Sequence, residues 1–340
     1  MPKTSLLAVV AVVAWTLSGF TVPTAAAPAP IAAAVAASSA PGSAPGRPLP
    51  LGRRVEFGAF VDGMPGGAGV LTGFEALIGR DTDIASYYYG YGDVFPGPLE
   101  TAYSDGGDRT VLVSWDMGPT RFTDWASGTE DHYLDVIAAA ARAWPGELYV
   151  RPWPEMNGDW QQFQPTPSGD KPYGGTYREF RAAWRHVVTY LRQHGADNLH
   201  WVFNPTADTY AGTTPARRIW PGSRYVDVLG LDGYNWGDSE NGLRWRGFDD
   251  IFREQYRNLV RLDRSAPVWI CETASKEPAV ADGAPVDPRH SKRRWIRQML
   301  ASRAMPEVTA IVWFDALKER DWRVASSPGA LAALRRGLGA

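Results

Sequence analysis

The sequence contains a single cysteine, Cys271, in 340 residues, so no disulfide can form within the chain. Stability must therefore come from the burial of apolar side chains. The chain also lacks a strong charge of either sign, because 35 basic and 37 acidic residues leave a net charge of −2. Such a balance argues against a nucleic acid or an anionic membrane as the main partner.

Several motifs are missing as well. The five histidines, at positions 132, 186, 194, 200 and 290, form no pair with metal-ligand spacing, and we predict no metal and no cofactor. No Gly-x-Ser-x-Gly segment is present, which argues against serine hydrolysis. The glycines at 63–67 lack the spacing of a dinucleotide-binding loop.

The first 50 residues differ in composition from the rest. Lys3 precedes an apolar stretch, residues 6–17, that is too short to span a bilayer, and small residues follow it up to Ala26. This pattern predicts a secretory signal peptide over residues 1–26, although an uncleaved membrane anchor is an alternative. Residues 27–50 are almost all Ala, Pro, Ser and Gly and predict a disordered linker. We therefore expect a secreted, extracellular protein whose folded domain covers residues 51–340.

Short apolar runs alternate with helical periodicity in the remainder of the chain. The predicted strands are 55–61, 84–89, 110–114, 148–151, 199–203, 226–231, 268–271 and 308–314. The main helical patterns fall at 70–78, 134–141, 177–191, 248–260, 295–300 and 327–338. Alternating units favour a parallel sheet with right-handed crossovers, and eight of them favour a closed barrel. The sequence thus predicts an α/β fold, a single (β/α)8 TIM barrel, and we expect a monomer.

Polar and aromatic residues gather where the predicted strands end, which is where such barrels carry their functional groups. Indole rings can stack on the apolar face of a pyranose, while carboxylates and amides bind its hydroxyl groups. The residues predicted to contact a sugar are Trp115, Asp116, Trp153, Asn157, Trp160, Asn204, Tyr234, Trp236, Trp313 and Trp322. The charged segment 318–322 could equally be a solvated loop.

Two glutamates stand out among these strand ends. Pro152 and Pro154 cannot continue a ladder, so Glu155 lies at or just past a strand end. Glu272 ends the strand 268–271, which lies nearly opposite in an eight-stranded barrel. If Glu272 points inward, alternation directs Cys271 toward the helices as a small buried hydrophobe. A lone strand-end glutamate is often only a cap or a surface salt bridge, but a facing pair can act as acid/base and nucleophile.

Three segments, at 151–160, 231–236 and 269–273, resemble glycoside hydrolase family 26, a family of retaining β-glycanases that are mostly β-mannanases. The resemblance implies a barrel in which Glu155 is the acid/base and Glu272 is the nucleophile. It also implies that Tyr234 hydrogen-bonds the nucleophile and that Trp160 and Trp313 form sugar-binding surfaces. The implied partner is a β-linked polysaccharide or oligosaccharide.

The sequence departs from the family pattern at two positions. Family members usually carry histidine where this chain has Pro154 and Asp116. The first expectation is a secreted, endo-acting, β-1,4-mannanase-like hydrolase that works by double displacement. Alternatives are action on β-1,3-1,4-glucan or β-1,3-xylan, and a non-catalytic carbohydrate-binding barrel. Arg151 could lower the pKa of Glu272 or form a buried ion pair with Asp232.

Overall fold

The computed structural model describes residues 55–237, 243–278 and 287–340. The predicted signal peptide (1–26) and linker (27–50) lie outside the described residues, so these boundaries stay predictions. Within the described ranges, no helix combines the length and the hydropathy that crossing a bilayer requires.

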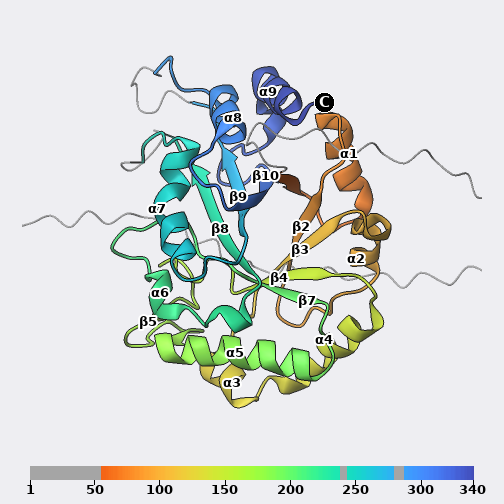
Figure 1. Cartoon of the computed structure of the whole chain (residues 1–340), viewed down its shortest axis with the longest axis vertical. Helices are drawn as coiled ribbons and strands as arrows, with labels where there is room; N and C mark the ends of the chain where they lie inside the picture. Colours follow the sequence, from red (N-terminus) through yellow and green to blue (C-terminus); the bar gives the residue numbers. More distant parts are fainter. Residues whose placement is uncertain (1–54, 238–242, 279–286) are drawn as a thin grey trace, which may run out of the picture. The chain divides into compact units, whose positions relative to one another are not determined.

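Eight parallel strands close into a barrel in the order β1-β10-β9-β8-β7-β4-β3-β2, which confirms the predicted fold (Figure 1). The strands are β1 (Glu56–Val61), β2 (Ile84–Tyr89), β3 (Thr110–Trp115), β4 (Leu148–Pro152), β7 (Leu199–Phe203), β8 (Val228–Asn235), β9 (Val268–Ser275) and β10 (Val308–Asp315). A separate two-residue ladder pairs β5 (Pro165–Thr166) with β6 (Gly175–Thr176).

Strands β8 and β9 extend four residues beyond their predicted ends, 231 and 271. They continue to pair with each other from Asp232↔Glu272 to Asn235↔Ser275. The apolar pattern ends earlier because several of these residues are polar and find hydrogen-bond partners inside the protein, as Asn235 does with Ser275. The extensions of β8 and β9 therefore carry Asp232, Tyr234 and Glu272.

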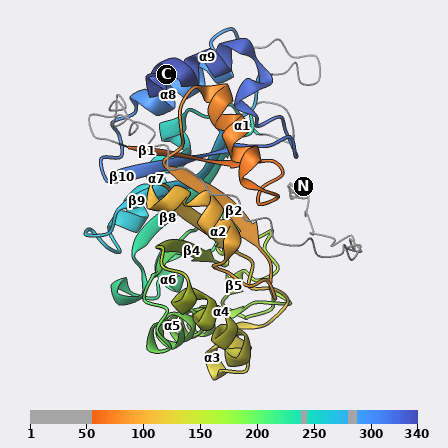
Figure 2. The same cartoon turned by 90° about the vertical axis from the view of Figure 1, so that its right-hand side faces the viewer.

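Helices surround the barrel on all sides (Figures 1 and 2). They are α1 (Ala68–Ile78), α2 (Pro98–Tyr103), α3 (Phe122–Ser127), α4 (Asp131–Ala143), α5 (Tyr177–Gln193), α6 (Ala216–Ile219), α7 (Phe248–Val260), α8 (Lys292–Ala301) and α9 (Pro328–Leu338). Ser291 caps α8 as its position suggests, since its side chain accepts a hydrogen bond from the Arg294 amide. The sequence missed α2, α3 and α6, which are too short to show a period of 3.6 residues.

One part of the barrel interior is filled by apolar side chains. One cluster joins side chains from six different strands, Ile84, Leu112, Val202, Val228, Trp269, Cys271, Ala310 and Val312. Only inward-facing residues can meet in this way. Cys271 is buried as expected, but the expectation that it faces the helices was wrong, because both Cys271 and Trp269 point into the barrel.

A β-bulge explains this difference. The pairing of β8 with β9 passes from Leu231↔Ile270 to Asp232↔Glu272 and skips Cys271. A bulge places two consecutive residues opposite one, so the simple alternation of faces is interrupted. Glu272 therefore joins the inward-facing residues directly after Cys271, and both side chains lie inside the barrel.

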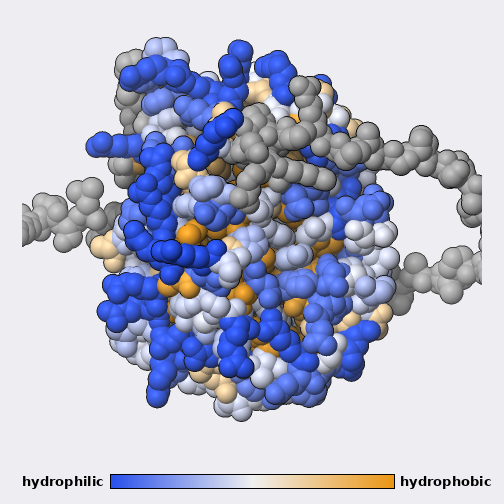
Figure 3. Space-filling model, viewed as in Figure 1, coloured by the Kyte–Doolittle hydropathy of each residue, from blue (hydrophilic) through white to orange (hydrophobic). Residues whose placement is uncertain are grey.

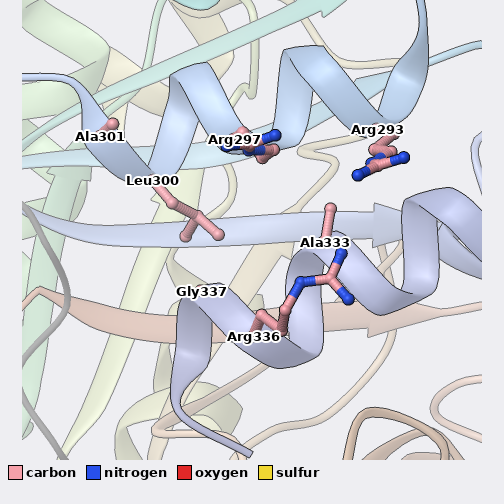
Figure 4. Close-up of a pocket in the computed structure, with 7 residues that line it drawn as sticks. All are labelled: Arg293, Arg297, Leu300, Ala301, Ala333, Arg336 and Gly337. Carbon is pink, nitrogen blue, oxygen red and sulfur yellow. The ribbon is translucent and has the colours of Figure 1, made fainter.

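The surface is mainly hydrophilic on the face seen in Figure 1, with hydrophobic residues in small separate areas between polar ones (Figure 3). A shallow cavity of about 500 Å³ lies between α8 and α9, lined by Arg293, Arg297, Leu300, Ala301, Ala333, Arg336 and Gly337 (Figure 4). It belongs to the outer helical layer and is separate from the strand ends.

Candidate active site

Glu272 is surrounded by hydrogen-bond donors that favour its ionised form. The Tyr234 hydroxyl donates to Oε2 at 2.5 Å, the Tyr88 hydroxyl donates to Oε1 at 2.6 Å, and Arg151 Nη2 also donates to Oε1. Burial opposes ionisation, but Arg151 and the two tyrosine hydroxyls outweigh it and lower the pKa of Glu272. The residue is only 8% exposed, and its carboxylate is held in the ionised form.

Arg151 is fully buried beneath this carboxylate and is bonded on each side. Its Nη1 donates to Asp232 Oδ2 at 2.7 Å, and its Nε donates to Ser114 Oγ at 2.7 Å. Asn204 Nδ2 donates to the same Asp232 oxygen at 2.7 Å. Arg151 therefore fills both roles that the sequence left open, because it pairs with Asp232 and also contacts Glu272.

Glu155 emerges from β4 on an unusual backbone. Trp153 has φ 49° and Glu155 has φ 54°, so both residues that flank Pro154 adopt the left-handed conformation. Such a conformation costs of order 1–3 kcal/mol per non-glycine residue and is concentrated at functional sites. The Glu155 amide donates to the Asn204 carbonyl at 2.9 Å, which ties the turn to the end of β7.

The environment of Glu155 favours its protonated form. Burial first, and then the negative charge of Glu272, raise the pKa of Glu155 to about 8. Trp160 Nε1 lies 3.3 Å from Glu155 Oε2 and can donate to it. The two glutamates thus share one mouth with pKa values shifted in opposite directions, which is the pattern expected of an acid and a nucleophile.

Aromatic rings line the mouth next to Tyr234. The Tyr234 ring lies 5.0 Å from that of Trp322 and 5.8 Å from that of Phe314, and Trp236 lies 5.0 Å from Trp322 between ring centroids. Lys292 fixes the segment that carries Trp322, because its buried Nζ donates to the carbonyls of residues 321 and 323 and to the Ser326 hydroxyl.

Four of the predicted sugar-stacking tryptophans were wrongly assigned. Trp115, Trp153, Trp313 and Trp322 are at most 1% exposed and offer no ring face to a ligand. The first three face the surrounding helices, as their contacts with Trp125, Phe180 and Trp295 show. On β10 the inward position belongs to Phe314, the neighbour of Trp313, because side chains alternate along a strand.

Both predicted amides are also fully buried and hold the backbone. Asn157 accepts a hydrogen bond from the Thr206 amide at 2.7 Å and so joins two loops. The Asn204 side-chain amide donates a hydrogen bond to Asp232. Asp116 is exposed, and its side chain accepts a hydrogen bond from the Gly118 amide. Of the predicted contacts, Trp160, Tyr234, Trp236 and Asp116 keep surface that a ligand could reach.

Tyr88 is the site residue that sequence reasoning missed. It stands near the end of β2 with the same parity as Ile84 and Ser86, and its ring packs edge-on against Phe60 at 5.0 Å. A signal was available, since Tyr88 is the penultimate residue of the predicted strand 84–89. The neighbours Tyr87 and Tyr89 concealed it, because three tyrosines in a row do not reveal which one faces inward.

Comparisons with known proteins agree with this geometry. The sequence profile described as "Glycosyl hydrolase family 26" matches residues 131–267. The chain is 33% identical over 292 residues to endoglucanase H of Acetivibrio thermocellus, covering 84% of this chain and 30% of that protein. This chain belongs to glycosyl hydrolase family 26. It spans less than a third of the length of endoglucanase H.

Other proteins match over shorter stretches or in fold alone. A mannan endo-1,4-β-mannosidase of Bifidobacterium adolescentis is 32% identical over 120 residues, which is 33% of this chain and 11% of that protein. An endo-β-1,4-mannanase double mutant from Cellulomonas fimi has a TM-score of 0.56 at 16% identity, covering 84% of this chain and 70% of that one. Since the identity is low, the structural match supports the fold only.

Removal of either tyrosine hydroxyl should raise the pKa of Glu272. Tyr234→Phe and Tyr88→Phe each delete one donor that stabilises the carboxylate, so the proton should bind more tightly. We expect an upward shift in each variant, since a hydrogen bond to a charged group contributes roughly 1.5–3 kcal/mol. Carboxyl ¹³C NMR titration measures it.

Tyr190→Phe is the matched control, because the Tyr190 hydroxyl donates to the exposed Asp135 on the outer helices. An unchanged titration of Glu272 in both active-site variants would contradict the proposed stabilisation of its charge.

Proposed function

We propose that this chain is a retaining, endo-acting β-glycan hydrolase in which Glu155 is the acid/base and Glu272 is the nucleophile. The observation that carries the proposal is the geometry of one barrel mouth, in which Tyr234, Tyr88 and Arg151 all donate to Glu272. Glu155 lies in the same mouth beside the Trp160 indole, and the pKa values of the two carboxyl groups are shifted in opposite directions. Hydrolysis with retention requires both a protonated and an ionised carboxyl group before the first step. A sugar-binding barrel without catalysis would need neither.

The reaction would proceed in two displacements. In the first, a Glu272 oxygen attacks the anomeric carbon, the glycosidic bond breaks, and Glu155 donates its proton to the departing oxygen. In the second, water attacks the anomeric carbon, the bond to Glu272 breaks, and Glu155 takes up the proton of the water. Arg151, Tyr234 and Tyr88 hold Glu272 ionised and in place.

We place β-glucan, including β-1,3-1,4-glucan, first among the substrates. The similarity to endoglucanase H extends over 292 residues, whereas the similarities to mannosidases extend over 88 to 120. Pro154 and Asp116 also stand where the mannanase-like pattern predicts histidine. Mannan is the second candidate, because the family resemblance and several relatives point to it.

The surfaces proposed to bind sugar are the exposed parts of Trp160, Trp236, Tyr234 and Asp116. Trp160 lies beside Glu155, so its ring is suited to the sugar next to the cleaved bond. We further propose that the protein is exported, which rests on the composition of residues 1–26 alone.

The two glutamates should differ in their response to the leaving group. Glu272→Ala should abolish turnover of every substrate. Glu155→Gln should reduce kcat/KM for polysaccharide by roughly 10²–10⁴-fold, because that is the usual contribution of a general acid, but should spare kcat/KM for aryl glycosides, because their phenol leaves without a proton and kcat/KM does not include the second, base-assisted displacement. Steady-state kinetics with both substrate types measure this. Equal losses for both types in folded Glu155→Gln would refute its role.

Activity should depend on pH in a bell-shaped manner. Glu272 must be ionised, and since its pKa is lowered, the acid limb should lie below the ordinary range for glutamate. Glu155 must be protonated, so activity should fall as the pH rises through about 8. The profile of kcat/KM for the free enzyme tests both limbs. A loss of activity already near pH 5 on the alkaline side would contradict the assignment of Glu155.

Reducing-end release from a panel of polysaccharides should identify the substrate. We expect release from β-1,3-1,4-glucan to exceed release from mannan, glucomannan and β-1,3-xylan. Proton NMR of the first product should show the β-anomer before mutarotation, as retention requires. Sugar binding without release from any member would instead indicate a non-catalytic binding barrel.

A further inference from the structure

The indole of Trp153 occupies a cage of aromatic rings in the helical layer. Its ring centroid lies 5.7 Å from Phe122, 6.0 Å from Trp125, 5.7 Å from Phe180 and 6.3 Å from Trp184. The side chain is fully buried, and α3 and α5 supply all four neighbours. Rotation of the indole would require these rings to move.

The backbone attached to this indole is held in an unfavourable conformation. Trp153 and Glu155 have positive φ on either side of Pro154. Residues other than glycine avoid this region, and they stay there only where their surroundings fix them. The backbone of the segment has four hydrogen bonds. Trp153 N–H donates to the Trp115 carbonyl at 3.1 Å and Glu155 N–H donates to the Asn204 carbonyl at 2.9 Å. The Pro154 carbonyl accepts from Gln161 Nε2 at 3.3 Å, and the Glu155 carbonyl accepts from Gly158 N–H at 2.9 Å.

The caged indole and these hydrogen bonds determine the direction in which the Glu155 side chain points. A change of φ at residue 153 or 155 toward the ordinary negative range would swing the carboxyl group away from Trp160 Nε1. The hydrogen bonds alone would still allow φ of Trp153 to change if neighbouring torsion angles changed with it. A caged indole prevents this, because it fixes the positions of Cα and Cβ. The buried ring is therefore the anchor of the turn.

We propose that Trp153 is a positioning residue for the general acid, whose caged indole keeps Trp153 and Glu155 in the left-handed conformation that directs Glu155 toward the cleaved bond. The inference rests on the proposed function of Glu155. It gives Trp153 a role in catalysis without contact with the sugar.

Trp153→Phe tests this role, because it keeps an aromatic ring but no longer fills the cage. Misplacement of a general acid should slow polysaccharide cleavage by about tenfold or more, since that acid contributes roughly 10²–10⁴-fold. Cleavage of the dinitrophenyl glycoside of the product disaccharide needs no proton and should change by less than about threefold. The ratio of the two kcat/KM values is the readout, since a loss of stability alone lowers both equally.

Trp313→Phe is the matched control. Trp313 is also a fully buried tryptophan at the end of a strand and faces the helices, but its backbone φ is not positive. Its variant should leave the ratio unchanged. If Trp153→Phe does not fold, as near-ultraviolet circular dichroism would show, Phe122→Leu loosens the same cage from α3 and should lower the ratio in the same direction.

The outcomes separate the two proposals. If Glu155→Gln shows the leaving-group dependence but Trp153→Phe or, in its place, Phe122→Leu leaves the ratio at the wild-type value, the positioning role is overturned while the proposed function stands. If Glu155→Gln itself shows no such dependence, the proposed function fails. A lowered ratio in the Trp153 variant with an unchanged ratio in the Trp313 variant supports the inference.

Discussion

The buried guanidinium of Arg151 is the interaction on which the rest of the site depends. It is a permanent positive charge with no exposed surface, and such a charge is very unfavourable unless it is paired. Asp232 and Glu272 supply the pairing from neighbouring strands, and the Ser114 hydroxyl oxygen accepts the hydrogen bond from Arg151 Nε. Because breaking a buried pair costs roughly 3–5 kcal/mol, the positions of β4, β8 and β9 are fixed relative to one another. The same charge keeps the Glu272 carboxylate ionised, and that negative charge in turn helps to retain the proton on Glu155.

The apolar side chains that stabilise the barrel and the polar side chains of the candidate site occupy different parts of its interior. The apolar cluster around Cys271 and Trp269 fills one part of the interior, and the polar network of Arg151, Asp232 and Glu272 fills the part toward the strand ends. Most of these polar groups find partners on adjacent strands, whereas Asp232 Oδ1 and Asn204 Oδ1 are buried without a hydrogen bond among the described residues. The left-handed turn at Glu155 adds local strain, which the packed aromatic residues of α3 and α5 and the hydrogen bond to Asn204 offset.

Sequence reasoning located the two glutamates and Tyr234 correctly within the mouth, because strand ends can be recognised from prolines and from the end of an apolar run. It failed where one residue of offset matters. The bulge at Cys271 reversed the faces expected for that strand, and Trp313 was chosen where Phe314 points inward. Tyr88 escaped notice among three consecutive tyrosines. Periodicity gives the presence of a strand, but the pairing register decides which face each residue occupies.

The sequence by itself determined the eight-fold alternation of strands and helices, the family, and the identity of the two carboxyl groups, since these follow from local patterns and from short motifs. Only the tertiary structure decided which tryptophans are buried and which could meet a sugar, and it alone joined Tyr88 and Arg151 to a glutamate more than a hundred residues away. The physical reason is that pKa shifts and burial depend on neighbours across the barrel. Those neighbours are brought together by closure of the sheet and by one bulge, neither of which leaves a periodic signal along the chain.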